Sequence, residues 1–355
     1  MLSATQDKGM IPRSSTGIDI KYEKKSLRGY KKIEPGDFVV HLRSFQGGFA
    51  YSDLTGIVSP AYTVFTFKQP EMFNNYFWKE KFTSYNFIQL LKKVTYGVRD
   101  GRSISYSDFL TLNEKFPVKV EQTKIADLFK IIDNLITLQQ RKLEQLKLLE
   151  KALQQKLFPN SFQEKPLLRI LHGDNSWWNN YIGEVFTERV DKGSSEKLLS
   201  VSITDGVYPF DESKRKNNSS DDKHNYKKVF QNDIAYNSMR LWQGALGVSK
   251  YEGIVSPAYT VLKPLPNQNS IFYEFMFKNI DMLHIFQRNS QGLTSDTWNL
   301  KFNQLQHIKI KTTNLNSQNK IAKLLIKIEE LKNNESNYYH NLMTLKKYLL
   351  QKLFI

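Results

Sequence analysis

The sequence predicts an α+β protein in which two α/β domains are separated and followed by long helices that pair as an antiparallel coiled coil. Two observations support this prediction. A long helical pattern occurs twice, at 123–158 and 319–354, and both copies end in QKLF. The nonapeptide GIVSPAYTV also occurs twice, at 56–64 and 253–261, with every residue identical. Repeats in the same order indicate that the whole chain is an internal duplication.

The apolar residues of both helical copies recur at intervals of three and four residues, which is the spacing of a helical face that packs against another helix. Corresponding positions lie 196 residues apart throughout, since 321 − 125 and 349 − 153 both give 196. At about 1.5 Å per residue, each copy predicts a rod of roughly 50 Å. The predicted seam, which also serves as a partner surface, consists of Ile125, Leu128, Ile132, Leu135, Leu146, Leu149, Leu153, Ile321, Leu324, Ile328, Leu331, Leu342, Leu345 and Leu349.

The chain divides into five expected parts. We expect an α/β domain at 1–117, a helical spacer at 118–158, a linker at 159–166, a second α/β domain at 167–311 and a second helical spacer at 312–355. Short β-type runs between glycine turns predict the strands of the domains, and Pro159 ends the first helix because proline cannot continue it. Residues 169–198 have no counterpart before Leu2, so the first domain is expected to be N-terminally incomplete.

The composition favours a polyanionic partner. The net charge is +16, which points to nucleic acid first and to an acidic membrane surface second. There is no cysteine, which excludes disulfides and cysteine-based zinc sites and is compatible with a reducing compartment. No apolar run is long enough to span a membrane, and the N-terminus has no secretory signal. We therefore expect a cytoplasmic protein.

The sequence lacks the motifs of adenine-N6 methyltransferases and of nucleotide-hydrolysing enzymes. An adenine-N6 methyltransferase needs an (N/D)-P-P-(F/Y/W) tetrapeptide and a glycine-rich cofactor loop, and the sequence has neither. It also has no G-x-x-x-x-G-K-[ST] loop for nucleotide phosphates. HGDN at 172–175 resembles part of a phosphotransferase motif, but without its companion motifs we interpret it as a turn. The six histidines have no metal-ligand spacing. No catalytic or metal site is predicted.

Candidate DNA contacts lie in turns between predicted strands. Arginine and lysine contact phosphates and guanine, and asparagine or glutamine contacts adenine, so these residue types are the expected contacts. Arg43 and Gln46 correspond to Arg240 and Gln243, which suits a shared role on phosphates, although an arginine that only stabilises a turn is an equal alternative. A solvated loop is the alternative for the basic run at 214–216. The candidates are Arg43, Gln46, Arg99, Arg102, Lys214, Arg215, Lys216, Arg240 and Gln243.

Two further groups of apolar residues have alternative roles. Leu157, Phe158, Leu353 and Phe354 end the two rods, where they either grip a partner or cap the junction between domain and helix. Trp177 and Trp178 are expected to pack in a core.

These features resemble the specificity subunits of type I restriction-modification systems. The resemblance is carried by WWNNYIGEVF at 177–186, LLSVSITDGVYP at 198–209, the two GIVSPAYTV segments and the two helices that run from KIA to QKLF. It covers almost the whole chain, and its order of elements is similar to a target-recognition domain followed by a helical spacer, twice.

The resemblance implies a non-catalytic DNA-binding subunit. Each recognition domain would read one half of a bipartite site in double-stranded DNA, and the paired helices would act as a ruler. The chain would dock two modification subunits, which methylate adenine N6, and motor-nuclease restriction subunits would join them. The chain itself would bind no cofactor, because S-adenosylmethionine, ATP and Mg²⁺ belong to the partner subunits.

The sequence departs from this family at its start, where the counterpart of 177–185 is missing. Because of this departure, there is an alternative to a DNA-reading subunit. The chain could be a truncated or inactive specificity fragment that acts as a coiled-coil scaffold without reading DNA. A further possibility is that another chain completes the first domain. The bases that are read and the half-site spacing do not follow from the sequence.

Overall fold

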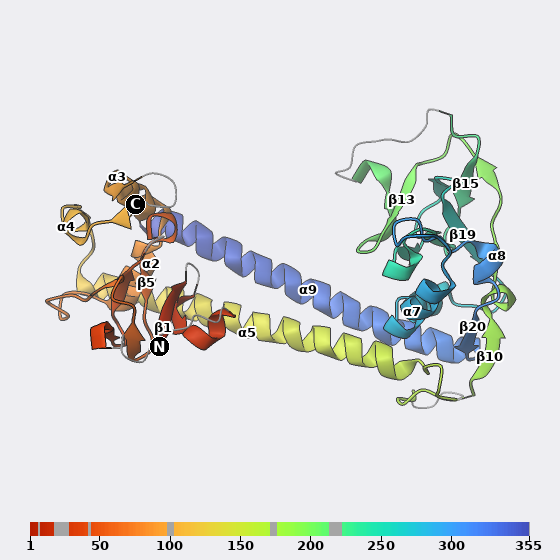
Figure 1. The fold of residues 1–355 in the computed structure, drawn as a ribbon, viewed down its shortest axis with the longest axis horizontal. Helices are drawn as coiled ribbons and strands as arrows, with labels where there is room; N and C mark the ends of the chain where they lie inside the picture. The colour runs from red at the N-terminus through yellow and green to blue at the C-terminus, as the bar shows by residue number, and fades with distance from the viewer. Residues whose placement is uncertain are drawn as a thin grey trace. The chain divides into compact units, whose positions relative to one another are not determined.

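The computed structural model describes residues 1–5, 8–17, 28–41, 44–97, 103–170, 176–212 and 222–354. The chain forms two compact units. Unit 1 comprises Met1–Lys142 and Glu335–Ile355, and unit 2 comprises Leu143–Asn334. The long helices α5 (Lys119–Leu157) and α9 (Leu315–Leu353) have 39 residues each. They are not separate domains, because each unit contains one end of α5 and the opposite end of α9 (Figure 1). The predicted fold class, with paired long helices, is confirmed within each unit.

The described residues of unit 2 form four small antiparallel sheets. Their strand orders are β11-β19-β16-β17, β12-β15-β18, β13-β14 and β10-β20. The strands are β10 (Trp178–Tyr181), β11 (Phe186–Glu188), β12 (Lys192–Gly193), β13 (Leu199–Ser202), β14 (Gly206–Pro209), β15 (Tyr226–Val229), β16 (Ile234–Asn237), β17 (Leu246–Val248), β18 (Gly253–Val255), β19 (Tyr259–Pro264) and β20 (Lys309–Thr312). The short helices are α6 (Ser270–Phe277), α7 (Ile280–Asn289) and α8 (Phe302–Leu305).

Among its described residues, unit 1 repeats this plan with fewer strands. Its sheets have the orders β5-β4-β7, β3-β6, β1-β2 and β8-β9. The strands are β1 (Leu2–Thr5), β2 (Gly9–Pro12), β3 (Lys31–Ile33), β4 (Phe38–Val40), β5 (Ala50–Tyr51), β6 (Gly56–Val58), β7 (Thr63–Phe65), β8 (Thr95–Tyr96) and β9 (Ser103–Ile104). The short helices are α1 (Ser44–Gly47), α2 (Asn75–Phe82), α3 (Tyr85–Lys93) and α4 (Tyr106–Phe109).

The strand register is the same in both units. Val39 of β4 lies opposite Val64 of β7, and Ala235 of β16 lies opposite Val261 of β19. The differences are 235 − 39 = 196 and 261 − 64 = 197, which are the offsets of the sequence repeat. A one-residue slip would turn every side chain to the other face of the sheet. The duplication therefore preserves the packing as well as the order of elements.

The repeated nonapeptide is a strand, a turn and a strand. Its glycine, Gly56 or Gly253, allows a close approach, because an added Cβ would lie 2.9 Å from Cγ of Leu2 or of Leu199 respectively. Its serine begins the turn, in which the Ser256 hydroxyl accepts a hydrogen bond from the Ala258 amide at 3.4 Å. These contacts explain why both the nonapeptide and the distant leucine recur in each half.

A buried glutamine joins each domain to the helix that follows it. Gln318 is 1% exposed; its side-chain carbonyl accepts from the Asn269 amide at 2.9 Å, and its NH₂ group donates to the Thr313 carbonyl at 2.7 Å. Asn269 in turn caps α6 by accepting from the Phe272 amide at 3.0 Å. One side chain thus connects the start of α9, the last strand region and the cap of α6.

Unit 1 contains the same joint. Gln122 is fully buried, accepts from the amide of Asn74 at 3.0 Å and donates to the carbonyl of Pro117 at 2.8 Å. Asn74 caps α2 in the way that Asn269 caps α6. Each long helix therefore starts at a fixed position on its own domain.

Replacing this glutamine should destabilise the protein more than its side-chain volume suggests. We expect Gln318→Ala to lower the free energy of unfolding by about 2–3 kcal/mol, because the Asn269 amide and the Thr313 carbonyl lose a buried partner. Urea denaturation followed by circular dichroism measures the change. Gln145→Ala, at an exposed position of α5, is the matched control. Equal effects of the two substitutions would contradict the role of the joint.

Candidate nucleic-acid interface and its helical support

The helix pair of unit 1 is antiparallel. Ile132 and Ile136 of α5 form a buried cluster with Leu342 of α9. Further toward the end of α9, Phe354 lies 5.7 Å from Phe129 between ring centroids. As residue numbers rise along α9, its contacts therefore move back toward the start of α5. Figure 1 shows this end of α9 beside α2 and α3.

A charged group ties the same end of α9 to α2. The Lys346 ammonium lies 2.7 Å from Asp133 and 3.1 Å from Glu80, whose side chain is 3% exposed. Burial raises the pKa of the Glu80 carboxyl, and Lys346 opposes that rise. Burial lowers the pKa of Lys346, but the two carboxylates raise it by more, so the group stays charged. Removal of the lysine would leave a buried carboxylate without its cation.

In unit 2 the two helices also pair in the antiparallel sense. The Lys332 ammonium lies 2.7 Å from Glu150 of α5. Leu153 and Ile321 both pack in the main core of the unit. Lys332 of α9 thus lies beside Glu150 of α5, whereas the earlier Ile321 of α9 shares a core with the later Leu153 of α5. The contacts therefore run in opposite directions along the two helices.

Polar residues lie in the part of the seam where the apolar spacing of the sequence is interrupted, between Leu135 and Leu146 of α5 and between Leu331 and Leu342 of α9. Gln139 is 6% exposed and donates to the Glu335 carbonyl at 2.9 Å and also to the Glu335 carboxylate. Lys142 pairs with Glu335 at 2.5 Å, while Tyr338 is 48% exposed. The interruptions are therefore polar contacts across the helix pair, with the exception of Tyr338.

The predicted seam residues fall into two groups. The buried or partly buried group lies between the helices or against a domain and consists of Ile125, Ile132, Leu146, Leu153, Ile321, Ile328, Leu342 and Leu349. The other group is 37–45% exposed and lies outside the seam; it consists of Leu128, Leu135, Leu149, Leu324, Leu331 and Leu345.

Several seam residues do not continue the leucine pattern and were not predicted from the sequence. Phe129 and Ile136 are buried in unit 1, and Leu325 is buried in unit 2. The actual seam also includes the polar Gln139 and Glu150. The signal that could have identified its phase is the identical pair Gln122 and Gln318, 196 residues apart, since a buried glutamine marks the inner face.

The residues at the helix ends cap the junction between helix and domain, which is one of the two roles expected for them. Leu157 and Phe158 are 3% exposed and belong to the core of unit 2. Phe354 is 3% exposed and packs on Phe77 of unit 1 at 5.2 Å. These residues cap the junction between helix and domain and are not available to grip a partner. Leu353 differs, because it is 39% exposed.

Most of the predicted DNA contacts lie outside the described residues. This applies to Arg43, Arg99, Arg102, Lys214, Arg215 and Lys216. Arg240 and Gln243 lie at a short 3₁₀ turn, η6 (Leu241–Gln243), which ends at Gly244 with a positive φ of 88°. The Arg240 guanidinium is 3.9 Å from the exposed Asp296, a weak pairing that leaves it accessible.

The corresponding turn of unit 1 borders a hollow. Gln46 lies in α1 and, with Phe45, Lys92, Thr95 and Gly97, lines a space of about 550 Å³. Gln46 and Gln243 therefore occupy equivalent places in the two domains. In unit 1, Lys92 lines the same hollow as Gln46.

Unit 2 has a hollow with a mixed polar and apolar lining next to the Arg240 turn. It measures about 390 Å³, and its lining includes Glu188, Lys227, Met239, Asn299, Lys301 and Asn303. Lys227 pairs with Glu188 at 3.0 Å. Lysine and asparagine are residue types that contact guanine and adenine edges. This group was not predicted from the sequence, because its members come from segments far apart in the chain.

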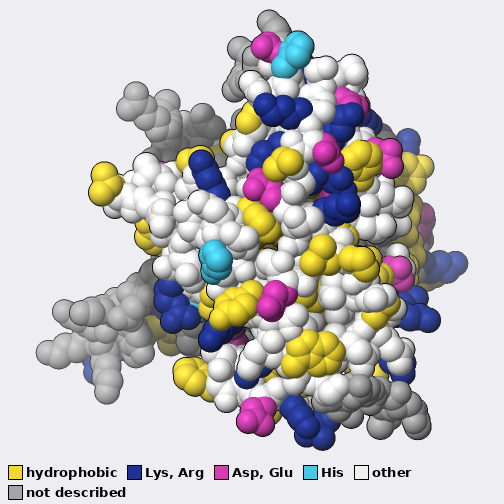
Figure 2. Space-filling view, turned by 90° about the vertical axis from the view of Figure 1, so that its right-hand side faces the viewer, with side chains coloured by type: hydrophobic (Ala, Val, Ile, Leu, Met, Phe, Trp, Pro, Cys, Tyr) yellow, Lys and Arg dark blue, Asp and Glu magenta, His cyan; other side chains and the backbone are white. Residues whose placement is uncertain are grey.

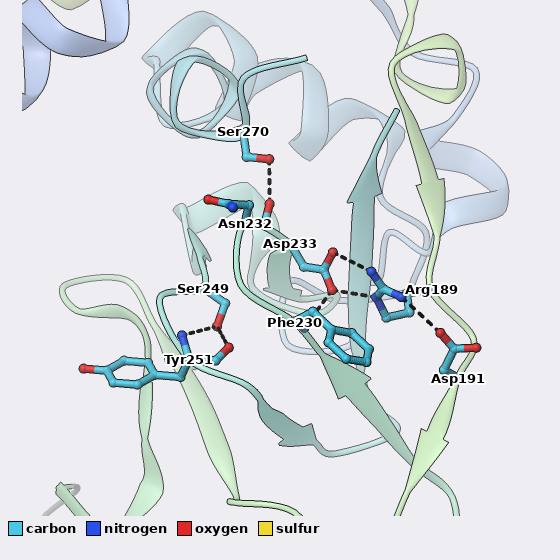
Figure 3. Close-up of polar contacts among 8 residues, drawn as sticks. All are labelled: Arg189, Asp191, Phe230, Asn232, Asp233, Ser249, Tyr251 and Ser270. Carbon is cyan, nitrogen blue, oxygen red and sulfur yellow. Dashed lines mark hydrogen bonds and ion pairs between the residues drawn. The ribbon is translucent and has the colours of Figure 1, made fainter. Parts of the chain in front are cut away.

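The opening segment of unit 2 is fixed by an ion pair. Arg189 donates to both carboxylate oxygens of Asp233, at 2.6 and 3.0 Å, and its guanidinium lies 4.5 Å from the ring centroid of Phe230 (Figure 3). The Asp233 side chain is 2% exposed, and its hydrogen bonds hold the pKa of Arg189 above the ordinary value. This pair is structural, since both of its members are turned into the domain.

The expectation for the adjacent tryptophans holds for only one of them. Trp177 packs against the core of unit 2, whereas Trp178 is 44% exposed. The physical reason is that Trp178 begins β10, and successive side chains in an extended segment point to opposite sides.

One face of the molecule has no patch made of a single type of side chain. Figure 2 shows basic, acidic and hydrophobic side chains interspersed over that face. Within the described ranges, no group of three or more histidine or acidic residues could hold a metal ion. Nor does any helix in these ranges have the length and apolarity for a membrane crossing.

The fold is that of specificity subunits of type I restriction-modification systems. The S subunit of the type I restriction-modification system from M. genitalium has 13% sequence identity and a TM-score of 0.55, over 92% of this chain and 84% of that one. The HsdS subunit from Thermoanaerobacter tengcongensis has 16% identity and a TM-score of 0.50, over 91% and 82%. No protein-family model matches the chain, and no curated protein matches it. The resemblance noted in the sequence is thus confirmed for the fold.

Breaking the buried ion pair should cost substantial stability. We expect Arg189→Ala to lower the free energy of unfolding by about 3 kcal/mol, because it leaves Asp233 buried without a cation. Thermal and urea denaturation measure the loss. Arg288→Ala, at an exposed position of α7, is the control and should change stability by less than about 0.5 kcal/mol. A loss at Arg189 no larger than in the control would show that the pair does not hold the segment.

Proposed function

We propose that this chain is the DNA sequence-specificity subunit of a type I restriction-modification complex. The main observation in support of this proposal is the duplication. The two domains have the same strand register, and a buried glutamine at equivalent positions, Gln122 or Gln318, joins each domain to a long helix. Two similar readers suit a bipartite site on double-stranded DNA. The net charge of +16 supports a polyanionic partner.

The two domains carry different side chains at equivalent positions. Lys301 caps α8 in unit 2, and Ser105 occupies the same position before α4 in unit 1. Two residues further on, unit 2 has Asn303 and unit 1 has Ser107. A lysine and an asparagine offer different hydrogen bonds to base edges than two serines do. The two halves of the recognised sequence should therefore differ.

Exposed leucines support the docking of two modification subunits. They occur at repeat-related positions of the two helices, and each pair is 196 residues apart: Leu128 and Leu324, Leu135 and Leu331, Leu149 and Leu345. Apolar side chains on the outer side of a helix pair are typical of a partner surface. Two equivalent stripes would bind two copies of one partner. In this proposal the chain is non-catalytic and acts in the cytoplasm, S-adenosylmethionine, ATP and Mg²⁺ are bound by the partner subunits, and restriction subunits join the complex.

Mapping of methylated adenines tests this function. In a host that contains this chain as the only specificity subunit, together with its modification subunit, we expect one asymmetric bipartite motif. The double substitution Lys301→Ser and Asn303→Ser gives unit 2 the residues of unit 1. It should change one half of the motif and leave the other half as it was.

The scaffold alternative gives a different result. In unit 1, no described strand pairs with β7 as β11 pairs with β19 in unit 2. Binding of the modification subunit without any methylation would support the scaffold and contradict the specificity role.

Lengthening the helix pair tests its role as a ruler. We expect a heptad inserted after Lys142 and another after Asn334 to widen the gap between the half-sites by about three base pairs, since seven residues add about 10 Å. A heptad preserves the seam on both helices. The half-site sequences should not change. The control carries the same insertion in the loop after Leu293, which is fully exposed. An unchanged gap in the heptad variant would contradict the ruler.

A further inference from the structure

The hollow beside the Arg240 turn of unit 2 is large enough to take a small ligand. Its volume of about 390 Å³ lies in the range of about 300–1,000 Å³ that is usual for small-molecule sites. Besides the polar groups described above, it is lined by Met239, Pro257, Ala258 and Phe302. The hollow therefore has room for a whole planar ring and offers apolar groups to the faces of that ring.

Hydrogen bonds hold the segments that line the hollow in place. The Ser238 hydroxyl donates to the Ala258 carbonyl at 2.7 Å, and the Leu300 amide donates to the Ser238 carbonyl at 2.9 Å. Asn299 exchanges two backbone hydrogen bonds with Gln291, at 2.8 and 2.9 Å. These bonds join the end of β16, the turn before β19 and the segment before α8, so the shape of the hollow does not depend on a ligand.

Two side chains of the lining provide hydrogen-bond acceptors. The side-chain oxygen of Asn299 is buried and has no hydrogen-bond partner among the described residues. An unpaired buried acceptor is unfavourable, and a rotation of the amide turns this oxygen toward the hollow that Asn299 lines. Glu188 is the second, because Lys227 donates to one of its carboxylate oxygens at 3.0 Å and a carboxylate can accept further bonds. A ligand that donates hydrogen bonds therefore suits the hollow.

A base that has left its stack matches this chemistry better than a base inside the duplex. A stacked base shows a protein only its edge in a groove, since its two faces are covered by its neighbours. Phe302 and Pro257 would find no apolar surface there, whereas they can cover the faces of an unstacked base. The acceptors of Asn299 and Glu188 suit the amino group of adenine, cytosine or guanine, which thymine lacks.

Unit 1 does not repeat this set of groups. Lys31 of β3 corresponds to Lys227 of β15, since β3 pairs with β6 as β15 pairs with β18. The Lys31 ammonium, however, donates to the carbonyl of Tyr62 at 2.5 Å. Ser107 stands in unit 1 where unit 2 has Asn303. We therefore expect an unstacked base at unit 2 and not at unit 1.

We propose that the hollow of unit 2 binds one base of its DNA half-site outside the stack, and that this base carries an amino group. The inference rests on the proposed function, because it takes the half-site as given. The apolar groups of the hollow cover the faces of the base, and Asn299 and Glu188 accept from its amino group. Unit 2 then reads how easily one base pair opens as well as which base it contains.

Duplexes with one weakened base pair test the proposal position by position. In each duplex one base of the methylated motif faces an abasic site, and fluorescence anisotropy gives the affinity for the complex of this chain with its modification subunit. The gain is the ratio of this affinity to that for the intact duplex. We expect a gain of about tenfold or more at one position of the unit 2 half-site, because a base that must leave the stack does so more easily when its pair is already broken. The unit 2 half-site is the half that changes with Lys301→Ser and Asn303→Ser.

The repeated nonapeptide provides a matched pair of variants. Ala258→Trp fills the hollow from an exposed position and should abolish the gain. Ala61→Trp is the control, because Ala61 is exposed at the same place in the nonapeptide of unit 1, and it should retain the gain. Ala258→Leu is a second, smaller block, and thermal denaturation shows whether each variant stays folded. A gain that survives both substitutions of Ala258 would belong to a base bound elsewhere and would overturn the proposal.

Two other results would overturn it. The first is a complex that methylates an asymmetric motif but shows no gain at any position, which would leave the proposed function intact. The second is binding of free 2′-deoxyadenosine that Ala258→Trp abolishes, seen by saturation-transfer NMR, without a gain for any duplex; a free nucleoside would then be the occupant. The absence of any methylated motif would instead contradict the proposed function, and this inference with it.

Discussion

The antiparallel pairing of α5 and α9 within each unit is the constraint on which the rest of the structure depends. It begins at Gln122 and Gln318, which fix the start of each helix on a domain. It ends at Phe354 and Phe158, which place the far end of each helix in a hydrophobic core. Because both ends are held by buried contacts, neither helix can slide without exposing apolar surface or leaving buried amides unpaired. The domains inherit their orientation on the helices from these joints.

In the proposed function, the duplication lets one scaffold carry two different readers. The strand register and the glutamine joints are repeated, so backbone positions are equivalent in the two units. Side chains on the candidate reading surface differ, as Lys301 and Ser105 illustrate. The residues that hold the fold are thus repeated, whereas the residues proposed to read DNA differ.

The sequence was sufficient for the architecture but not for the site. The offset between Ile125 and Ile321 predicted the duplicated helices, and GIVSPAYTV located equivalent strands. The phase of the seam was harder, because Leu128 and Leu345 continue the apolar pattern but are exposed, whereas Gln139 is polar and buried. Leucine spacing cannot distinguish an inner stripe from an outer one. The hollow around Lys301 was not predictable, because strand pairing brings its distant residues together.

A cysteine cross-link tests the pairing most directly, since the natural chain has no cysteine. Ile132 and Leu342 share one buried cluster in unit 1. In a variant with Ile132→Cys and Leu342→Cys, mild oxidation should give a cross-link within a single chain, seen as a faster-migrating monomer on a non-reducing gel. Cross-links that form only between chains would contradict the antiparallel pair. So would a cross-link in a second variant, with Ile132→Cys and Ile328→Cys, because parallel helices would bring these two positions together.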